Sequence, residues 1–290
     1  MALLLLSYCG GASAEPAKPS AGQRVVMVTG STSGLGYEVA KALADSGDHV
    51  IVHGRSDERG RELVREIMSA GKGSARFYQA DFSSMAEIQE LGQAVLRDYD
   101  QLDVLVNNAG FYRSEDAERY ESNDGLELHF QVNYLSGYVL TNMLMPLLEK
   151  SSPSRVVMVS SIGQSPLDFE DLMLESDYTP GQAYRQSKLA QIMMTFYYAD
   201  ALAQQGISIN ALHPSSLMDT RSVLRKGIEP QSSVLTGRDA VLQLVNEDVG
   251  TGRYFNVFEE DKAHAHAYDE EAVAQLMAVS EELTSATLGR

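Results

Sequence analysis

The feature that most constrains this chain is a cluster of glycines between an apolar run and an amphipathic segment. Residues 24–29 form the apolar run, and Gly30, Gly34 and Gly36 follow it. An apolar run that ends at such a turn is typical of a buried parallel strand. The helix expected after the turn would offer free N–H groups and a partial positive charge to a diphosphate. The alternative is a glycine-rich turn without a ligand.

The same alternation of strand and helix continues along the chain. We expect seven strands, built on residues 24–29, 50–52, 75–80, 102–106, 155–159, 207–212 and 253–258. We expect helices at residues 35–46, 58–68, 85–98, 124–149, 181–205 and 269–283. Strands that alternate with helices of this length favour an α/β fold, a doubly wound parallel sheet with helices on both faces.

No linker rich in Pro, Gly or Ser divides the chain. We therefore expect one domain over residues 23–290, with substrate-loop insertions near 162–183 and 215–240. Residues 1–22 are expected to be a leader, either disordered and dispensable or a weak signal-like segment, because their apolar run is short and has no basic residue before it. No later stretch is apolar enough for a transmembrane span, and we expect a cytoplasmic protein.

Charge and cysteine content exclude several classes of partner. The chain has 40 acidic and 23 basic residues, a formal net charge of -17. Because a nucleic-acid-binding protein needs cations to displace phosphate counterions, we expect no nucleic acid partner, and an anionic membrane surface is disfavoured for the same reason. The one cysteine, Cys9, can form neither an internal disulfide nor a cysteine-based zinc site. We expect a small-molecule substrate and no metal.

The end of the second expected strand indicates which dinucleotide the chain prefers. An NAD site commonly has an acid about 20 residues beyond the glycines, where it holds the ribose hydroxyls. Here Arg55 stands in that place. Because a guanidinium suits a 2′-phosphate, we predict NADP rather than NAD as cofactor. The alternative is a solvated surface arginine.

Further motifs follow in a fixed order. With Thr29-Gly-x-x-x-Gly-x-Gly36 at the start, they are Asp81, Asn107-Asn-Ala-Gly110, Asn133, Ser161 and Tyr184-x-x-x-Lys188. In this order they resemble the short-chain dehydrogenase/reductase family, whose fold is of the Rossmann type. The resemblance covers residues 24–258, and residues 155–161 and 184–190 look most like the retinol-dehydrogenase-like branch.

The resemblance implies a cofactor site that runs from the glycine turn to the sixth strand. Asp81 and Phe82 would lie beside the adenine, and residues 213–220 would cover the nicotinamide. The usual Pro-Gly is Pro214-Ser215 here, and Thr220 lies one residue further from the proline than is common. The implied cofactor residues are Gly30, Ser31, Ser33, Gly34, Leu35, Gly36, Arg55, Asp81, Phe82, Asn108, Ala109, Gly110, Tyr184, Lys188, Pro214 and Thr220.

Tyr184 is the candidate proton donor and acceptor. A tyrosine has an unperturbed pKa of about 10, and an ammonium nearby lowers it. Tyr184 and Lys188 are four residues apart on an expected helix and share one face. Ser161 ends the fifth strand, where its hydroxyl can bond a substrate carbonyl. In the family an asparagine at Asn133 anchors a water that relays protons to the lysine; the alternative is a local helix hydrogen bond.

The leading hypothesis is an oxidoreductase that interconverts a carbonyl and an alcohol by hydride transfer. Leu217 and Met218 would form an apolar lid or pack on the core, which favours an apolar substrate. Residues 166–181 would form a pocket wall or a solvated acidic loop. One alternative is a catalytically silent NADP-binding sensor or interaction protein. Another is a nucleotide-sugar enzyme, whose glycine spacing and larger C-terminal domain are absent here.

Two expected helices are apolar on more than one face. They cover residues 126–148 and 189–202, and such helices are buried on two sides. One side would face the sheet. The other would face a second subunit, giving a homodimer or homotetramer, or the rest of the same chain.

Overall fold

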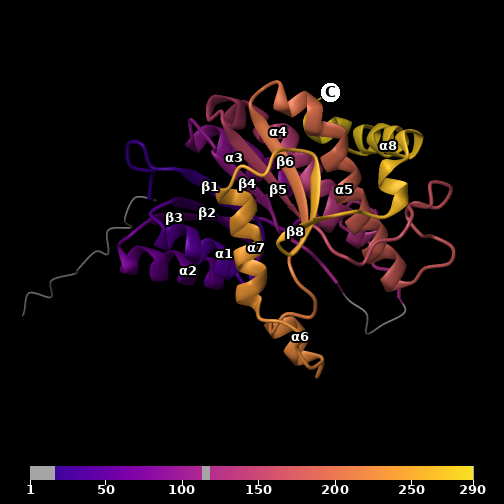
Figure 1. Ribbon diagram of the computed structural model, residues 1–290, viewed down its shortest axis with the longest axis horizontal. Helices are drawn as coiled ribbons and strands as arrows, with labels where there is room; N and C mark the ends of the chain where they lie inside the picture. Colours follow the sequence, from indigo (N-terminus) through magenta and orange to yellow (C-terminus); the bar gives the residue numbers. More distant parts are fainter. Residues whose placement is uncertain (1–16, 113–117, 290) are drawn as a thin grey trace, which may run out of the picture.

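The computed structural model describes residues 17–112 and 118–289, and in these ranges eight strands form one sheet. Figure 1 shows helices on both faces of this sheet. Strands β1 to β7 are parallel, and β8 pairs antiparallel with β7. The sheet order is β3-β2-β1-β4-β5-β6-β7-β8. The strands are β1 Val25–Val28, β2 His49–Gly54, β3 Ser74–Gln79, β4 Val104–Asn107, β5 Ser154–Val159, β6 Ile207–His213, β7 Arg253–Asn256 and β8 Glu259–Asp261.

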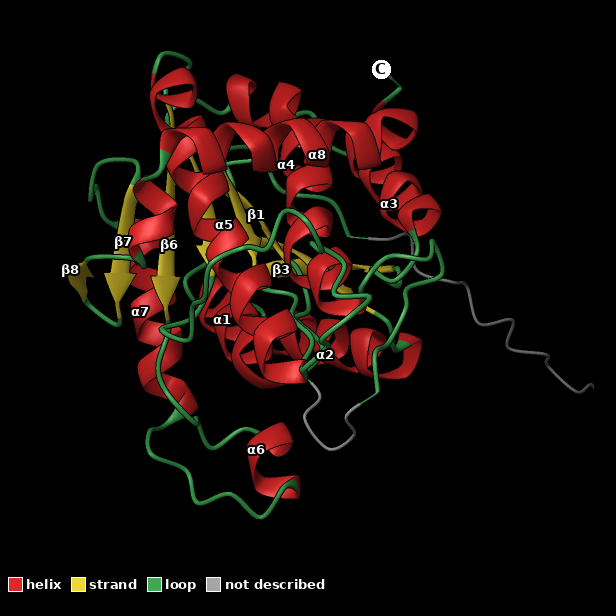
Figure 2. Cartoon of the chain, turned by 90° about the vertical axis from the view of Figure 1, so that its right-hand side faces the viewer, coloured by secondary structure: helices red, strands yellow, loops and turns green. Residues whose placement is uncertain are grey.

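The helices divide between the two faces of the sheet. Helices α1, α2 and α7 cover one face, and α3, α4 and α5 cover the other, with α8 packed outside them. Figure 2 shows α8 running across α4 toward α3. The helices are α1 Gly34–Asp45, α2 Asp57–Ala70, α3 Met85–Asp98, α4 Ser136–Lys150, α5 Pro180–Ala203, α6 Arg221–Arg225, α7 Val234–Asn246 and α8 Glu270–Leu288, with a π-helical turn η1 Phe130–Leu135 and a 3₁₀ turn η2 Ala265–Tyr268.

The sheet is buried on both faces, as a parallel sheet with helical crossovers must be. In β1 the side chains of Val25 and Met27 join the core under α4 and α5, while Val26 and Val28 join the core under α1 and α7. This alternation follows from the two-residue period of a strand. The run of apolar residues in the sequence therefore serves two cores, and the expected doubly wound parallel sheet is confirmed.

The order of the strands fixes where a ligand can bind. From β1 the chain builds outward to β2 and β3, then returns to the other side of β1 at β4. In open sheets of this kind, ligands bind in the crevice beyond the carboxyl ends of the strands, at the point where the order reverses. The glycine turn follows β1 and residues 108–110 follow β4. Both segments therefore flank that crevice.

Three expectations need correction within the described residues. Strand β8 was missed because its three residues are acidic and exposed, with no apolar pattern. Helix α7 was missed; it begins inside the expected 215–240 insertion and ends beyond it at Asn246, although the parallel crossover from β6 to β7 calls for a helix. The helix expected over 124–149 starts only at Phe130, and its first turn is π-helical.

Helix α8 covers the outer side of the helices that were expected to be buried twice. It packs against α3, α4 and α5, with Leu276 fully buried. Tyr134 and Ser280 form a buried hydrogen bond of 2.6 Å between η1 and α8. The rest of the same chain therefore accounts for this second burial. The homodimer and homotetramer stay predictions. In the part of the chain that the structure describes, no helix has the length and apolar character needed to cross a bilayer.

The bond between Tyr134 and Ser280 gives a test of how firmly α8 is held. Ser280 Oγ donates to Leu276 O, so the Tyr134 hydroxyl donates to Ser280. The change Ser280→Ala would leave a buried hydroxyl unpaired and should lower the free energy of unfolding by about 1–3 kcal/mol. Denaturant melts should show no comparable loss for Ser285→Ala, because Ser285 on the same helix is only partly buried and its hydroxyl donates to Glu282 O within that helix.

Candidate functional site

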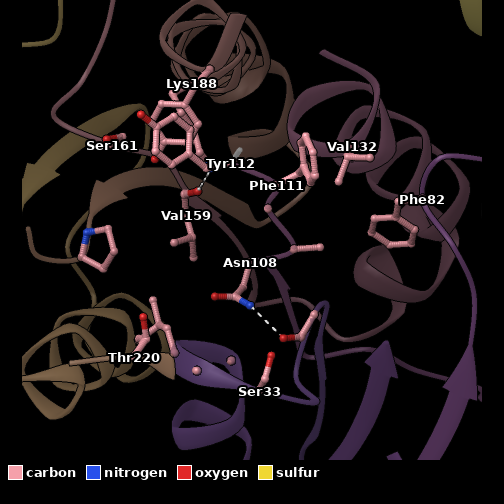
Figure 3. Close-up of a pocket in the computed structure, with 18 of the residues that line it drawn as sticks. Ser33, Phe82, Asn108, Phe111, Tyr112, Val132, Val159, Ser161, Lys188 and Thr220 are labelled. Carbon is pink, nitrogen blue, oxygen red and sulfur yellow. Dashed lines mark hydrogen bonds between the residues drawn. The ribbon is translucent and has the colours of Figure 1, made fainter. Parts of the chain in front are cut away.

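One cavity occupies the crevice at the carboxyl ends of the strands. Its volume is about 860 Å³. In Figure 3, Tyr112, Ser161 and Lys188 gather at one end, and Ser33 and Thr220 lie at the other. The structure brings together nearly all of the site residues expected from the sequence, and those that line the cavity are Gly30, Ser33, Gly34, Leu35, Gly36, Arg55, Asp81, Phe82, Asn108, Ala109, Gly110, Ser161, Tyr184, Lys188, Pro214 and Thr220.

The glycine turn packs directly on the segment after β4. Thr29 Oγ1 accepts hydrogen bonds from the backbone N–H groups of Asn108 and Ala109, both at 2.9 Å. Asn108 Nδ2 in turn donates to Thr29 O at 2.7 Å. A Cβ on Gly36 would lie 2.4 Å from Asn108 Nδ2, and one on Gly30 would lie 2.8 Å from Ala109 Cα. Side chains at these two glycines would force the segments apart.

The turn leaves hydrogen-bond donors for a ligand. Ser33 is the N-cap of α1 but makes no side-chain capping hydrogen bond. The first N–H groups of a helix have no partner within the helix, and here no capping side chain competes for them. With the narrow glycine backbone in front of them, these groups fit a dinucleotide diphosphate.

His53 holds the shape of the turn from β2. Its Nδ1 accepts from Gly30 N at 3.1 Å, and its Nε2 donates to Ala80 O at 3.2 Å. The ring stacks on Phe82 with 4.2 Å between centroids. Both Ser31 N and Ser31 Oγ donate to His53 O, so Ser31 lies behind the cavity wall and not in the cavity as expected. Sequence reasoning missed His53, since nothing in its spacing marks it.

Two arginines line the cavity beyond the end of β2. Arg55 is 69% exposed, and its Nη1 lies 3.8 Å from Asp81 Oδ2. Arg59, in the first turn of α2, also lines the cavity. Arg59 was not among the expected residues. The sequence signal that could have indicated Arg59 is Ser56, a typical N-cap residue. Its hydroxyl accepts from Arg59 N and so places Arg59 in the first turn of α2.

The reactive end holds Ser161, Tyr184 and Lys188. Burial raises the pKa of Tyr184, and a hydrogen bond with Ser161 partly opposes this rise. Burial also lowers the pKa of Lys188 to about 7. The Lys188 ammonium lies 5.8 Å from the centre of the Tyr184 ring. The lowered tyrosine pKa expected from the spacing is therefore not found, because burial of the phenol is the largest influence on the pKa of Tyr184.

Asn133 lies on the π-helical turn, behind the loop after β4. Its Oδ1 accepts from Phe111 N at 2.6 Å, and its Nδ2 donates to Phe111 O and to Ser187 Oγ. Single π-helical turns within helices are frequent at functional sites. Here the Asn133 amide anchors the loop that carries Gly110, and Asn133 does not itself line the cavity.

The entrance to the reactive end is largely apolar. Tyr112 packs beside Tyr184 with 4.8 Å between ring centroids, and Lys226 Nζ lies 4.7 Å from the Tyr112 ring centre. Neither was predicted. Other apolar side chains that line the cavity are Phe111, Leu128, Val132, Ile162, Leu217 and Met218.

Two expectations for the cavity walls are modified. Of residues 166–181 only Gly181 lines the cavity, so this acidic segment does not form the expected wall. Thr220 lines the cavity across from the glycine turn, with its methyl 3.6 Å from the position of a Cβ on Gly34. Thr220 therefore lies beside the glycine turn.

The sheet order, the glycine turn and the cluster of Ser161, Tyr184 and Lys188 define the class of dinucleotide-binding dehydrogenase folds. A family model described as short chain dehydrogenase matches residues 24–226. The chain therefore belongs to the short-chain dehydrogenase/reductase family.

Known proteins similar to this chain agree with that family. It is 37% identical to human polyprenol dehydrogenase over 71% of this chain and 64% of that protein, so it spans less than two thirds of that relative. It is 30% identical to human retinol dehydrogenase 13 over 97% of this chain and 90% of that protein. The Pseudomonas aeruginosa RhlG/NADP complex matches with a TM-score of 0.66 and 25% identity, over 80% of this chain and 94% of that one. These names support the retinol-dehydrogenase-like branch.

Acid should weaken the fold through His53. Burial lowers the pKa of His53 to about 4. An unfolded histidine takes up its proton near pH 6.5, so the stability that neutral His53 provides is lost as the pH falls from about 6.5 to 4. His53→Gln should reduce the loss in unfolding free energy between pH 7 and pH 5 by about 2 kcal/mol. Denaturant melts at the two pH values measure it, and an unchanged pH dependence would contradict this role.

Proposed function

We propose that the chain is an NADP-dependent oxidoreductase that interconverts an alcohol and a carbonyl, with Tyr184 as general acid and base. The observation that carries this proposal is the placement of Ser161 and Lys188 at one end of a cavity whose other end holds Ser33 of the glycine turn (Figure 3). Tyr184 lines the same cavity, with its ring centre 5.8 Å from the Lys188 ammonium. A binding module would need the turn but not the acid–base cluster. The names of the similar dehydrogenases support the same reaction class.

The nicotinamide, when bound, accepts or supplies the hydride. In the oxidation direction Tyr184 takes the proton of the alcohol hydroxyl as the hydride leaves carbon; in the reduction direction it returns that proton to the carbonyl oxygen. Ser161 donates a hydrogen bond to the same oxygen and holds it beside the phenol. The Lys188 ammonium stabilises the phenolate that forms, because opposite charges attract strongly in a buried site.

The preference for NADP rests on Arg55 and Arg59. Both line the adenosine end of the cavity, where a 2′-phosphate would lie between them. Guanidinium groups bind phosphate through charge-assisted hydrogen bonds. Asp81, 3.8 Å from Arg55, would hold that guanidinium in place. The NADP named with the similar RhlG complex agrees with this choice.

The substrate that fits best is apolar. Ile162 and Leu217 are 54% and 39% exposed although they line the cavity, and Tyr112, which packs against Tyr184, is 48% exposed. Such side chains lose contact with water when an apolar chain covers them, which favours binding. The similar polyprenol and retinol dehydrogenases are named for apolar alcohols.

The proton-transfer role is tested by Tyr184→Phe. Loss of a general acid or base typically costs about 10²–10⁴-fold in rate, so NADPH oxidation with a panel of ketones, aldehydes and retinoids should fall by at least about 100-fold. Binding of NADPH, measured by its fluorescence, should persist. Tyr197→Phe is the matched control, because Tyr197 is exposed on the same helix. Full turnover in Tyr184→Phe would end the proposed mechanism, and no turnover by the unchanged protein would favour a silent binding protein.

The cofactor preference is tested by Arg55→Ala. Removing one phosphate-binding guanidinium should weaken NADPH binding about tenfold and leave NADH binding unchanged, since NADH lacks the 2′-phosphate. Titration calorimetry without substrate measures both affinities. The control is Arg61→Ala, because Arg61 is exposed on α2, pairs with Asp57 and does not line the cavity. Equal losses for both cofactors would count against NADP selection by Arg55.

A further inference from the structure

Gln191 is a fully buried residue of α5 with no assigned role. It lies three residues after Lys188, and its Oε1 accepts a hydrogen bond from Lys188 Nζ at 3.0 Å. Its Nε2 has no hydrogen-bond partner among the described residues. Its backbone oxygen accepts from Thr195 Oγ1. The described hydrogen bonding of the Gln191 side chain is therefore directed at Lys188 alone.

A buried polar group without a partner is costly to the fold. Leaving a buried amide nitrogen unpaired destabilises a protein by about 1–3 kcal/mol, whereas an apolar side chain of similar shape would avoid that cost. A methionine at position 191 would therefore stabilise the fold about as well as Gln191 does. It would lack the oxygen that accepts a hydrogen bond from Lys188.

Lys188 depends on few acceptors to remain charged. Its Nζ donates to Val159 O at 2.9 Å and to Gln191 Oε1 at 3.0 Å. None of the ion pairs found in residues 17–112 and 118–289 joins a carboxylate to Lys188. Burial is the cause that lowers its pKa. The oxygens of Val159 and Gln191 are therefore the described groups that stabilise the charged form of Lys188, which burial disfavours.

The elements packed around Lys188 bring few titratable groups to its side of the cavity. Tyr184 lies on the same helix, with Tyr112 beyond it on the loop after β4. His213 lines the cavity from β6, and burial lowers the pKa of His213 to about 4. From η1 and β5 the nearby polar groups are Asn133 and Ser160, which carry no charge. Lys188 is thus the side chain on which Gln191 acts.

We propose that Gln191 is a positioning residue that holds the Lys188 ammonium beside Tyr184 and favours the protonated form of Lys188 over the neutral one. This role rests on the proposed function. The third N–H of Lys188 stays available for the cofactor ribose or a water. The amide oxygen of Gln191 carries only a partial negative charge. It therefore stabilises the ammonium without cancelling the positive potential of that ammonium at Tyr184, as a carboxylate would.

The first test measures protons and needs neither cofactor nor activity. Because the folded pKa of Lys188 lies below its ordinary value, unfolding takes up a proton over the pH range between the two. In Gln191→Met the folded pKa should fall further, so this range extends to lower pH. The slope of unfolding free energy against pH, measured at pH 6.5, should show greater proton uptake than in the unchanged protein.

The matched control is Gln186→Met. Gln186 is equally buried on the same helix, but its Nε2 donates to Leu172 O and none of its described bonds reaches Lys188. Gln186→Met should leave proton uptake at pH 6.5 unchanged even if it lowers stability. Should Gln191→Met not fold, Gln191→Asn keeps the amide but draws its oxygen away from Nζ, and the same change in uptake is expected. Equal uptake in Gln191 variants and the control would overturn the proposal.

The second test follows the pH dependence of kcat/KM. With Lys188 losing its proton at lower pH, the Gln191→Met enzyme should be near normal at pH 6 and about tenfold slower at pH 8, the effect of roughly one pKa unit. A residue that served packing alone would lower the rate equally at both. A uniform loss would contradict the proposal. Absence of any turnover would count against the proposed function, while proton uptake would still decide the role of Gln191.

Discussion

The site depends on the close contact between the end of β1 and the end of β4. Thr29 Oγ1 accepts two backbone hydrogen bonds from the segment after β4, and Thr29 O accepts a third from Asn108 Nδ2. These bonds stand where the strand order reverses, so they fix the floor of the crevice. The glycine turn lies on one side of this floor, and Tyr184 with Ser161 and Lys188 lies on the other. A longer distance between the ends of β1 and β4 would move the glycine turn away from Tyr184, and one cofactor could then no longer reach both.

Burial governs the chemistry of the cavity more than pairing of charges does. It raises the pKa of Tyr184 and lowers the pKa of Lys188, so each group is pushed toward its neutral form. The bonds from Lys188 to Val159 and Gln191 oppose that tendency. The proposed reaction needs the Tyr184 phenolate and the Lys188 ammonium at the same time, in a cavity where burial disfavours each charge alone. Folded proteins stabilise such charges with dipoles that are already oriented, here the oxygens of Val159 and Gln191.

Much of the fold and part of the site could be predicted from the sequence, and the physical reasons are specific. Parallel strands carry apolar runs because both faces are buried, which is why β1 and β5 were found and the acidic β8 was not. The glycine turn and the Tyr184–Lys188 pair were found because their spacing is itself the signal. His53, Tyr112 and Gln191 act through contacts with residues from other elements or through burial, and no spacing encodes those. Asn133 was predicted as a site residue. Its bonds to Phe111 and Ser187 depend on a π-helical turn, which no sequence pattern predicted.

Helix α8 also bears on how the chain is made. Its partners lie far back in the sequence: Ser280 meets Tyr134, and the backbone of Thr287 accepts from Gln89. Of the described helices it is the last to be synthesised, so the outer side of α4 stays uncovered until residues 270–288 have left the ribosome. Domains form during synthesis from the N-terminal end, and uncovered apolar surface favours aggregation. The apolar outer sides of α4 and α5 must therefore wait, in contact with water or with a chaperone, until α8 has been made.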